Sequence, residues 1–179
     1  GRRIDFEVSV DETPFETEPS THFFVANELK KAHVVADSMA PRFVGEFQKG
    51  IDYIGDVKQF HESFKVHCAI AKEFGYRISV HSGSDKFSIY PSVAELTGGK
   101  FHVKTAGTNW LEAVRVIAEQ EPELYRKMHR CALDSLEDAK KLYVVHCDLS
   151  KIKPLDEVED NNLIDYLNQD DSRQLLHIT

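Results

Sequence analysis

The chain has 179 residues, of which 41% are hydrophobic and 29% charged, and its net charge is −8. These values are typical of a folded globular protein with a real core, and they exclude a disordered chain. Lys and Arg are scattered, which argues against nucleic acid and anionic membranes as partners, because both need a basic surface. The apolar runs are too short for a membrane span, and three cysteines without C-x-x-C spacing favour a reduced, cytoplasmic protein.

Hydrophobic spacing predicts strands that alternate with helices. Residues 4–11 alternate apolar and polar side chains with a period of two, which indicates a strand. Further strands are expected within 33–43, from 76 to 81 and within 100–108, and helices at 21–31, 56–74, 88–96, 109–117 and 121–142. The remaining tail is less regular: a short extended stretch at 143–152 precedes a small helix and a terminal apolar run.

Four strands alternating with helices predict a parallel sheet and therefore the α/β class. The inward positions of these strands are polar, with Glu7, Ser79, His81, His102 and Lys104 among them. A doubly wound sheet has continuous apolar strands instead, whereas a (β/α)8 barrel carries polar side chains around its active site. Four strands make half of such a barrel, so we predict a partial TIM-barrel-like fold, or another fold with the same pattern, with 1–179 as a single domain.

Two side chains at strand ends are candidates for chemistry. Asp11 ends the first strand, where a carboxylate can bind a divalent metal or move a proton; the alternative is that it caps the following loop. His81 opens a polar loop after the third strand and is a candidate metal ligand, the alternative being a satisfied core histidine. Glu7 lies deeper and needs a cationic partner to stay charged, for which Lys104 is a candidate. His102 is also inward, but deeper than His81.

Loop residues supply the candidate substrate contacts. Hydroxyl, carboxylate and ammonium groups of the kind that bind a sugar acid lie close together in the loop of residues 82–86. The stretch 104–108 offers threonine hydroxyls and glycine amides just before a helix. The expected substrate-binding residues are Ser82, Ser84, Asp85, Lys86, Lys104 and Thr105. Arg42 can bind a substrate carboxylate or form a surface ion pair. His177 is a further ligand candidate if the chain natively continues beyond it.

The strings "FEVSVDET", "APRFVGEFQKGIDYIGD", "SVHSGSDKFSIYP", "HVKTAGTNWLEAVRV" and "DDSRQLLHIT" together resemble the tagaturonate epimerase family over essentially the whole chain. The resemblance implies a metal-dependent TIM-barrel enzyme that interconverts tagaturonate and fructuronate at C4 in hexuronate catabolism. It also implies that this chain is the carboxyl-terminal part of a longer protein, inactive by itself, which stops where the family continues past a terminal strand. Self-association or association with the amino-terminal half is then expected.

On this resemblance, His81 ligates a divalent zinc, manganese, cobalt, nickel or iron ion. Asp11 is either a second ligand or the acid/base group for the C4 hydroxyl. No G-x-G-x-x-G follows a strand, so nothing supports a nicotinamide site, and retro-aldol cleavage of C3–C4 is the favoured route. Two other functions remain: a Schiff-base aldolase that uses Lys104, and a non-catalytic domain that binds sugar acids.

Overall fold

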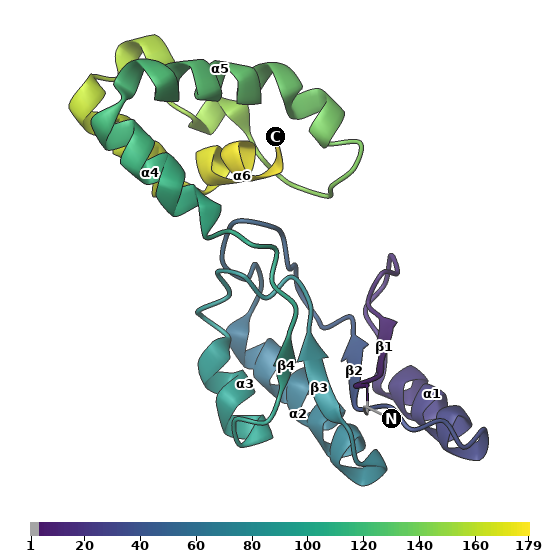
Figure 1. The fold of residues 1–179 in the computed structure, drawn as a ribbon. Helices are drawn as coiled ribbons and strands as arrows, with labels where there is room; N and C mark the ends of the chain where they lie inside the picture. The colour runs from purple at the N-terminus through teal and green to yellow at the C-terminus, as the bar shows by residue number, and fades with distance from the viewer. Residues whose placement is uncertain (1–3) are drawn as a thin grey trace. The chain divides into compact units, whose positions relative to one another are not determined.

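A computed structural model describes residues 4–179 and divides the chain into two compact units (Figure 1). The first unit contains the described residues up to Phe47 together with Asp52–Thr105, and the second contains Gln48–Ile51 and Ala106–Thr179. The single domain expected over 1–179 stays a prediction, since two compact units can belong to one domain of a longer protein.

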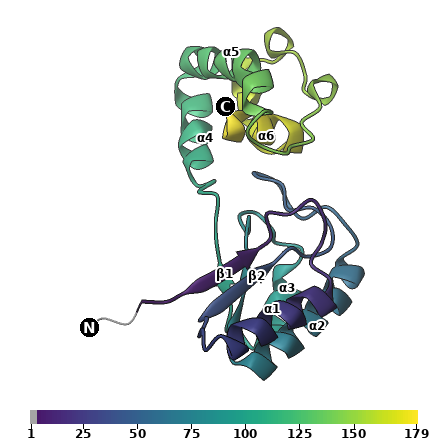
Figure 2. The same cartoon turned by 90° about the vertical axis from the view of Figure 1, so that its right-hand side faces the viewer.

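The first unit is built on a four-stranded parallel sheet, which confirms the α/β class. Its strands follow one another in space as in the sequence: β1 (Glu7–Val10), β2 (Ser38–Pro41), β3 (Arg77–Val80) and β4 (His102–Val103). Helices α1 (Pro19–Lys31), α2 (Val57–Phe74) and α3 (Tyr90–Thr97) connect them and lie on one side of the sheet (Figure 2). The predicted strands and helices are therefore confirmed, with β2 and β4 shorter than expected.

Helix α2 shows how the sequence sets these elements. The Asp56 side chain accepts hydrogen bonds from the backbone N–H groups of Lys58 (2.7 Å) and Gln59 (3.2 Å), which satisfies the free donors of the first turn. Gly75 ends the helix in the left-handed conformation, with φ of 80°. The helix buries Phe60, Phe64, His67 and Ala71 against Ile78 and Val80 of β3 in one core.

The opposite face of the sheet is concave. In a flat sheet, β1 and β4 would lie about 14 Å apart, because three strand spacings separate them. Glu7 Oε2 on β1 nevertheless lies 3.0 Å from His102 Nδ1 on β4. The sheet must curve for these two side chains to meet, and the curvature gathers the inward side chains of all four strands in one place.

The second unit is helical. It contains α4 (Trp110–Gln120), α5 (Pro122–Ala139), three 3-10 helices, η1 (Leu149–Lys151), η2 (Leu155–Glu157) and η3 (Asp160–Leu167), and the terminal helix α6 (Asp170–Ile178). Its core gathers Leu111, Tyr125, Leu136, Leu163 and Leu175. Among the described residues, none of the helices is long and apolar enough to span a membrane.

The structure corrects two expectations for the tail. The strand implied for the terminal "LLHIT" is wrong, because these residues belong to α6 up to Ile178. The Gln169 side chain accepts a 2.7 Å hydrogen bond from the Ser172 N–H and starts a helix whose Leu175 and Leu176 enter the core. The extended stretch expected at 143–152 forms no strand, and Leu149–Lys151 is a 3-10 turn that the Asp148 side chain caps.

Candidate functional site

Strand register brings polar side chains together on the concave face. Glu7 on β1 pairs with Ser38 on β2, and Ser79 on β3 pairs with His102 on β4. Their sequence neighbours Met39, Ile78 and Val80 are buried, and the last two pack toward the helices. Alternation therefore turns one set of side chains to the core and the other set to a shared polar surface.

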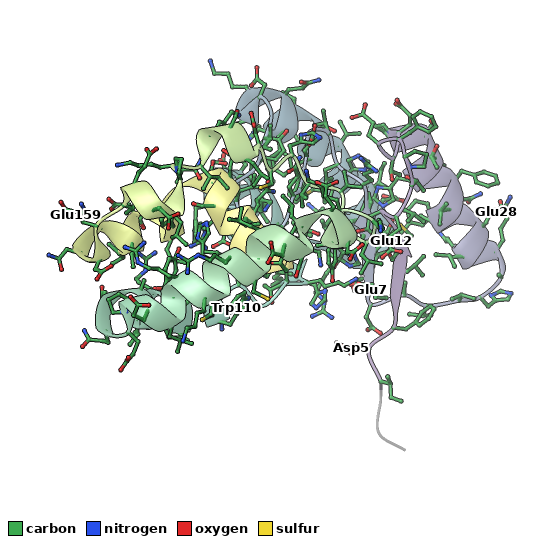
Figure 3. All side chains as sticks on the ribbon, turned by 90° about the horizontal axis from the view of Figure 1, so that it is seen from above. Asp5, Glu7, Glu12, Glu28, Trp110 and Glu159 are labelled. Carbon is green, nitrogen blue, oxygen red and sulfur yellow. The ribbon has the colours of Figure 1, made fainter. Side chains whose placement is uncertain are left out.

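The Glu7 carboxylate is the centre of this surface. One oxygen, Oε1, lies 2.7 Å from His81 Nε2, and the other, Oε2, accepts a 2.6 Å hydrogen bond from Ser38 Oγ. The same Oε2 lies 3.0 Å from His102 Nδ1. Figure 3 labels Glu7 on β1 between Asp5 and Glu12. A single carboxylate thus contacts side chains from the three other strands or their ends.

These contacts keep Glu7 ionised. Burial by itself would raise the pKa of the Glu7 carboxyl, but hydrogen bonds from Ser38, His81 and Ser79, together with the charge of His81, outweigh it and lower that pKa to about 2. Glu7 is therefore an acceptor at any physiological pH. A second negatively charged group cannot lie against the Glu7 carboxylate unless a cation lies beside it.

The ring of His102 is oriented by Glu7 and Ser79. Its Nδ1 lies 2.8 Å from Ser79 Oγ and 3.0 Å from Glu7 Oε2. Because the neighbouring Glu7 oxygen only accepts, a proton or a cation must occupy the Nδ1 side of the ring. His102 lies level with Ser79 in the strand register, but its side chain is 48% exposed, whereas that of His81 is 7% exposed.

His81 lies between two carboxylates. Its Nε2 faces Glu7 at 2.7 Å and its Nδ1 faces Asp11 Oδ2 at 3.0 Å, and the side chain is only 7% exposed. The Nδ1 contact lacks hydrogen-bond geometry, so this buried nitrogen has no hydrogen-bond partner among residues 4–179. A neutral imidazole has one N–H, so it would turn a lone pair toward one of the two carboxylates. The two carboxylates therefore face the ring of His81 from both of its nitrogen atoms.

Side chains of the cluster are in direct contact with one another. In residues 4–179, no group of three or more His, Cys, Asp or Glu side chains is arranged so that it could hold a metal ion. The ligand types are nevertheless suitable: Glu7, His81 and His102 offer one carboxylate and two imidazoles, a set that zinc, iron and manganese accept. The separations seen here are those of direct hydrogen bonds, so the side chains would have to move apart to admit an ion.

Asp11 lies beside this cluster. Ser9 Oγ donates a short hydrogen bond to Asp11 Oδ1, while Oδ2 faces His81, so both carboxylate oxygens are held. The side chain is 19% exposed. The structure therefore brings the two predicted ligands, Asp11 and His81, together.

Arg42 and Lys104 lie differently from the expectations. Arg42 ties the loop after β1: its guanidinium donates a short hydrogen bond to the Thr13 carbonyl, and its backbone N–H donates to Thr17 Oγ1 at 2.9 Å. Lys104 was expected to pair with Glu7, and this is wrong. The described partners of Glu7 are two serines and two histidines, whereas Lys104 is exposed, as is Thr105.

The loop after β3 contains the remaining predicted residues. Ser82 and Asp85 adopt left-handed backbone conformations, with φ of 50° and 62°. Ser84 is buried, and Lys86 is fully buried and donates a 3.0 Å hydrogen bond to the Ser84 carbonyl. The predicted substrate contacts of this loop stay predictions, and the position of Lys86 gives it an internal role.

Gly83 is the residue of this loop that tolerates no side chain. A Cβ built there would lie 2.4 Å from Val103 Cγ1 and 3.0 Å from the Tyr90 hydroxyl. We expect Gly83→Ala to lower the free energy of unfolding by about 1–3 kcal/mol, because overpacking displaces the loop from β4. Urea unfolding of Gly83→Ala, Val103→Ala and the double variant tests this. If the double variant is no more stable than the sum of the two single changes predicts, the clash is not the cause.

Histidines away from the concave face are structural, as expected for His22, His67 and His129, all of which are buried. His177 on α6 accepts a 3.1 Å hydrogen bond at Nδ1 from the Trp110 indole, within the second unit. Strand alternation placed Ser79 inward but gave no role for it, and sequence reasoning did not single out Ser38. Their position opposite Glu7 and His102 could be found only from the strand register.

Comparisons with known proteins agree with one another. A model of the family described as tagaturonate epimerase (UxaE) matches residues 1–179. The chain is 52% identical over 177 residues to the tagaturonate/fructuronate epimerase of Thermotoga maritima. The matched residues cover 98% of this chain and 37% of that protein. It is 57% identical to the fructuronate-tagaturonate epimerase UxaE of Cohnella laeviribosi. A native and a glycerol-complexed crystal structure of that protein each match with a TM-score of 0.97, covering 100% of this chain and 36% of theirs. The chain thus spans little more than a third of the length of these relatives.

Proposed function

Because the chain belongs to the tagaturonate epimerase family, we propose that the protein containing it interconverts tagaturonate and fructuronate by epimerisation at C4. This would make it a cytoplasmic isomerase of hexuronate catabolism whose substrate is a small keto-sugar acid. The observation that carries the proposal is the Glu7-centred cluster, which places a carboxylate and two imidazoles on the concave face of a parallel sheet. The segment alone is proposed to be inactive, since it is a part of the whole enzyme.

The curved sheet fits one side of a (β/α)8 barrel. Helices lie on the convex side and polar side chains on the concave side, as in that fold. Edge strands expose backbone N–H and C=O groups that need partners. We propose that the rest of the longer protein pairs with β1 and β4 and closes the barrel; pairing with a second copy is the alternative.

Glu7, His81 and His102 are the proposed ligands of a divalent metal ion. The two Glu7 oxygens lie 2.7 Å from His81 Nε2 and 3.0 Å from His102 Nδ1. With His81 Nε2 turned to the ion, Nδ1–H would face Asp11, which is the carboxylate–histidine–metal arrangement that fixes the orientation of a ligating imidazole. A bound divalent ion would stabilise negative charge on the substrate's keto and hydroxyl oxygens.

Asp11 is the proposed acid/base group. In the retro-aldol route its carboxylate takes the proton of the C4 hydroxyl, the C3–C4 bond breaks, and the bonding electrons remain on the fragment that carries the C2 carbonyl. After the C4 aldehyde rotates, the bond re-forms on its other face and Asp11 returns the proton to the C4 oxygen. The contacts to Ser9 and His81 hold the carboxylate in place for both transfers.

The Schiff-base alternative is not favoured. A nucleophilic lysine of that class needs an apolar pocket or a second cation to lower its pKa, and Lys104 is exposed. Ser82, Ser84, Asp85 and Thr105 stay proposed contacts for the sugar hydroxyls, with Arg42 and Lys104 as proposed contacts for the substrate carboxylate. Lys86 was grouped with them from the sequence, and its burial is taken up below.

The direct test uses the whole protein with purified tagaturonate and fructuronate. We expect interconversion in both directions by NMR, loss of activity by at least about 100-fold after treatment with EDTA, and recovery on adding back one divalent metal. Borohydride added during turnover should trap no adduct on Lys104. Binding of either keto-sugar acid in calorimetry without turnover would instead support a non-catalytic binding domain, and trapping without EDTA sensitivity would support the aldolase.

A further inference from the structure

Lys86 carries a positive charge inside the protein. Its side chain is fully buried, and Nζ donates a 3.0 Å hydrogen bond to the carbonyl of Ser84. Two carboxylates act on this ammonium: Asp85 from the same loop, and Asp52 from the segment before α2. Removing an ammonium from water is strongly unfavourable unless hydrogen bonds and opposite charges compensate for it. In this position Lys86 contacts the protein rather than a substrate.

The loop around Lys86 has an uncommon backbone. Ser82 and Asp85 are non-glycine residues in the left-handed region, which persists only where neighbouring contacts hold it. Gly83, between them, donates its N–H to the Lys104 carbonyl at 3.0 Å and accepts a short hydrogen bond from the Tyr90 hydroxyl. The bond from Lys86 to Ser84 fixes the part of the loop that these two contacts do not reach.

Asp52 holds the far end of the same loop. Its carboxylate accepts hydrogen bonds from the Ser88 N–H at 3.1 Å and from Ser88 Oγ at 2.9 Å. Lys86 therefore lies in the sequence between two fixed points, Gly83 and Ser88, and two carboxylates, Asp85 and Asp52, act on its charge. His81 begins this loop, so the loop conformation decides where the imidazole points.

We propose that Lys86 is a positioning residue: its buried charge holds the loop of residues 82–86, and through it His81, in the working conformation. The kinetic part of its test rests on the proposed epimerase function, but the structural part does not. Lys86 differs in this from the loop's serines, which are candidates for direct substrate contact.

The charge of Lys86 is sensitive to alkaline pH. Burial lowers the pKa of its ammonium to about 8, and the nearby Asp85 and Asp52 only partly offset that effect. Below pH 8 the ammonium is charged and holds the Ser84 carbonyl strongly. Above pH 8 it becomes a neutral amine, the attraction to both carboxylates is lost, and the loop loosens.

Kinetics of the whole enzyme test this proposal with the wild type, two variants of Lys86 and one control variant. We expect kcat/KM of the wild type to fall about 10-fold, reversibly, between pH 7.5 and 9.5. Lys86→Arg keeps its charge over that range, so its kcat/KM should stay flat. Lys86→Met should be at least about 10-fold slower than wild type at pH 7 and should show no alkaline fall. Lys100→Met, which removes an exposed lysine, is the matched control and should follow the wild type.

A loss of stability alone would lower activity without moving the pH profile. An alkaline fall that persists unchanged in Lys86→Arg, or full activity in Lys86→Met at pH 7, overturns the proposal. Should the variants not fold, the wild type provides the second measurement. Hydrogen exchange of the amides of residues 82–88, corrected for intrinsic rates, should become about 10-fold less protected between pH 7 and 9, while α2 stays unchanged.

Hydrogen exchange also separates the two proposals. A protein that epimerises neither sugar acid but loosens this loop above pH 8 contradicts the proposed function and supports the role of Lys86. An active epimerase whose loop protection is independent of pH supports the function and contradicts the role of Lys86.

Discussion

Replacing Glu7 by glutamine should remove both the metal and the activity of the whole enzyme. The amide keeps the size of the carboxylate, but it loses the negative charge and turns a donor toward one of its partners. Ser38 and His102 direct a polar atom at one carboxylate oxygen and His81 directs one at the other, so the amide can bond to all three only by turning its NH2 to an unprotonated His81 Nε2, which then has no lone pair left for a metal ion. We expect at least about a 100-fold fall in kcat/KM, with metal content reduced to a small fraction of the wild-type value.

Metal analysis of the purified variant, beside the fructuronate and tagaturonate assay, measures this effect. Glu16→Gln is a matched control, because Glu16 is exposed and lies outside the cluster. Both its metal content and its activity should equal those of the wild type. A Glu7→Gln protein that retains stoichiometric metal and most of its activity would show that the cluster on the concave face is a structural hydrogen-bond network.

Asp11→Asn distinguishes the two roles considered for Asp11. If Asp11 only orients His81 and moves the C4 hydroxyl proton, the variant keeps its metal, with affinity weakened by about 10–100-fold, and loses kcat. If Asp11 is itself a ligand, the metal binds on the Nδ1 side of His81, which lies 3.0 Å from Asp11 Oδ2. The variant then loses its metal as completely as Glu7→Gln does. The contrast between the two variants therefore assigns the side of the imidazole that binds the metal.

The sequence predicted the parts of this site that depend on local pattern. Alternation in residues 4–11 placed Glu7 inward, and the position of His81 after an apolar strand marked it as a ligand candidate. Helix α2 was predictable in the same way, since Asp56, Gly75 and the apolar spacing between them each have a local physical effect. These signals lie within about 20 consecutive residues.

Contacts between side chains on different strands could not be predicted from local sequence patterns. The choice of Lys104 as the cation for Glu7 followed a sound rule about buried charge, but the register and curvature of the sheet bring His81 and His102 there instead. The strand at the terminal "LLHIT" was implied by the family resemblance alone; the residues themselves indicated a small helix and an apolar run, and packing against the second unit's core extends the helix to Ile178. Contacts between residues that are distant in the sequence decide between structures that the local pattern favours equally.

Acid should destabilise the first unit through a pair of buried histidines. His22 on α1 and His67 on α2 place their Nδ1 atoms 2.8 Å apart, and His22 Nε2 lies 2.7 Å from the Tyr76 hydroxyl. Both rings are almost fully buried. One Nδ1 must donate and the other accept, so the pair holds together only while at least one of the rings is neutral.

The direction of the pH effect follows from the pKa values. Burial, reinforced for His22 by the charge of His67, lowers the pKa of both imidazoles from 6.5 to about 4. Above pH 6.5 neither the folded nor the unfolded state is protonated, and the pair contributes its full stability. As the pH falls from 6.5 toward 4, the imidazoles are protonated in the unfolded state but not in the folded state. The free energy of unfolding therefore falls by on the order of 3 kcal/mol for each ring.

Urea unfolding at pH 7, 6, 5 and 4 measures that loss in the wild type and in His67→Asn. Asparagine places an amide near the position of Nδ1, so it can still bond to His22, but it cannot be protonated in this range. We expect the variant to lose about 3 kcal/mol less than the wild type between pH 7 and 4. His61→Asn on the same helix is the matched control, because the His61 ring is only partly buried and bonds to Ser92 Oγ at 3.0 Å rather than to a second imidazole. Equal pH slopes in all three proteins would place the acid sensitivity elsewhere, since removing a titrating group from the pair must flatten the slope if that group causes it.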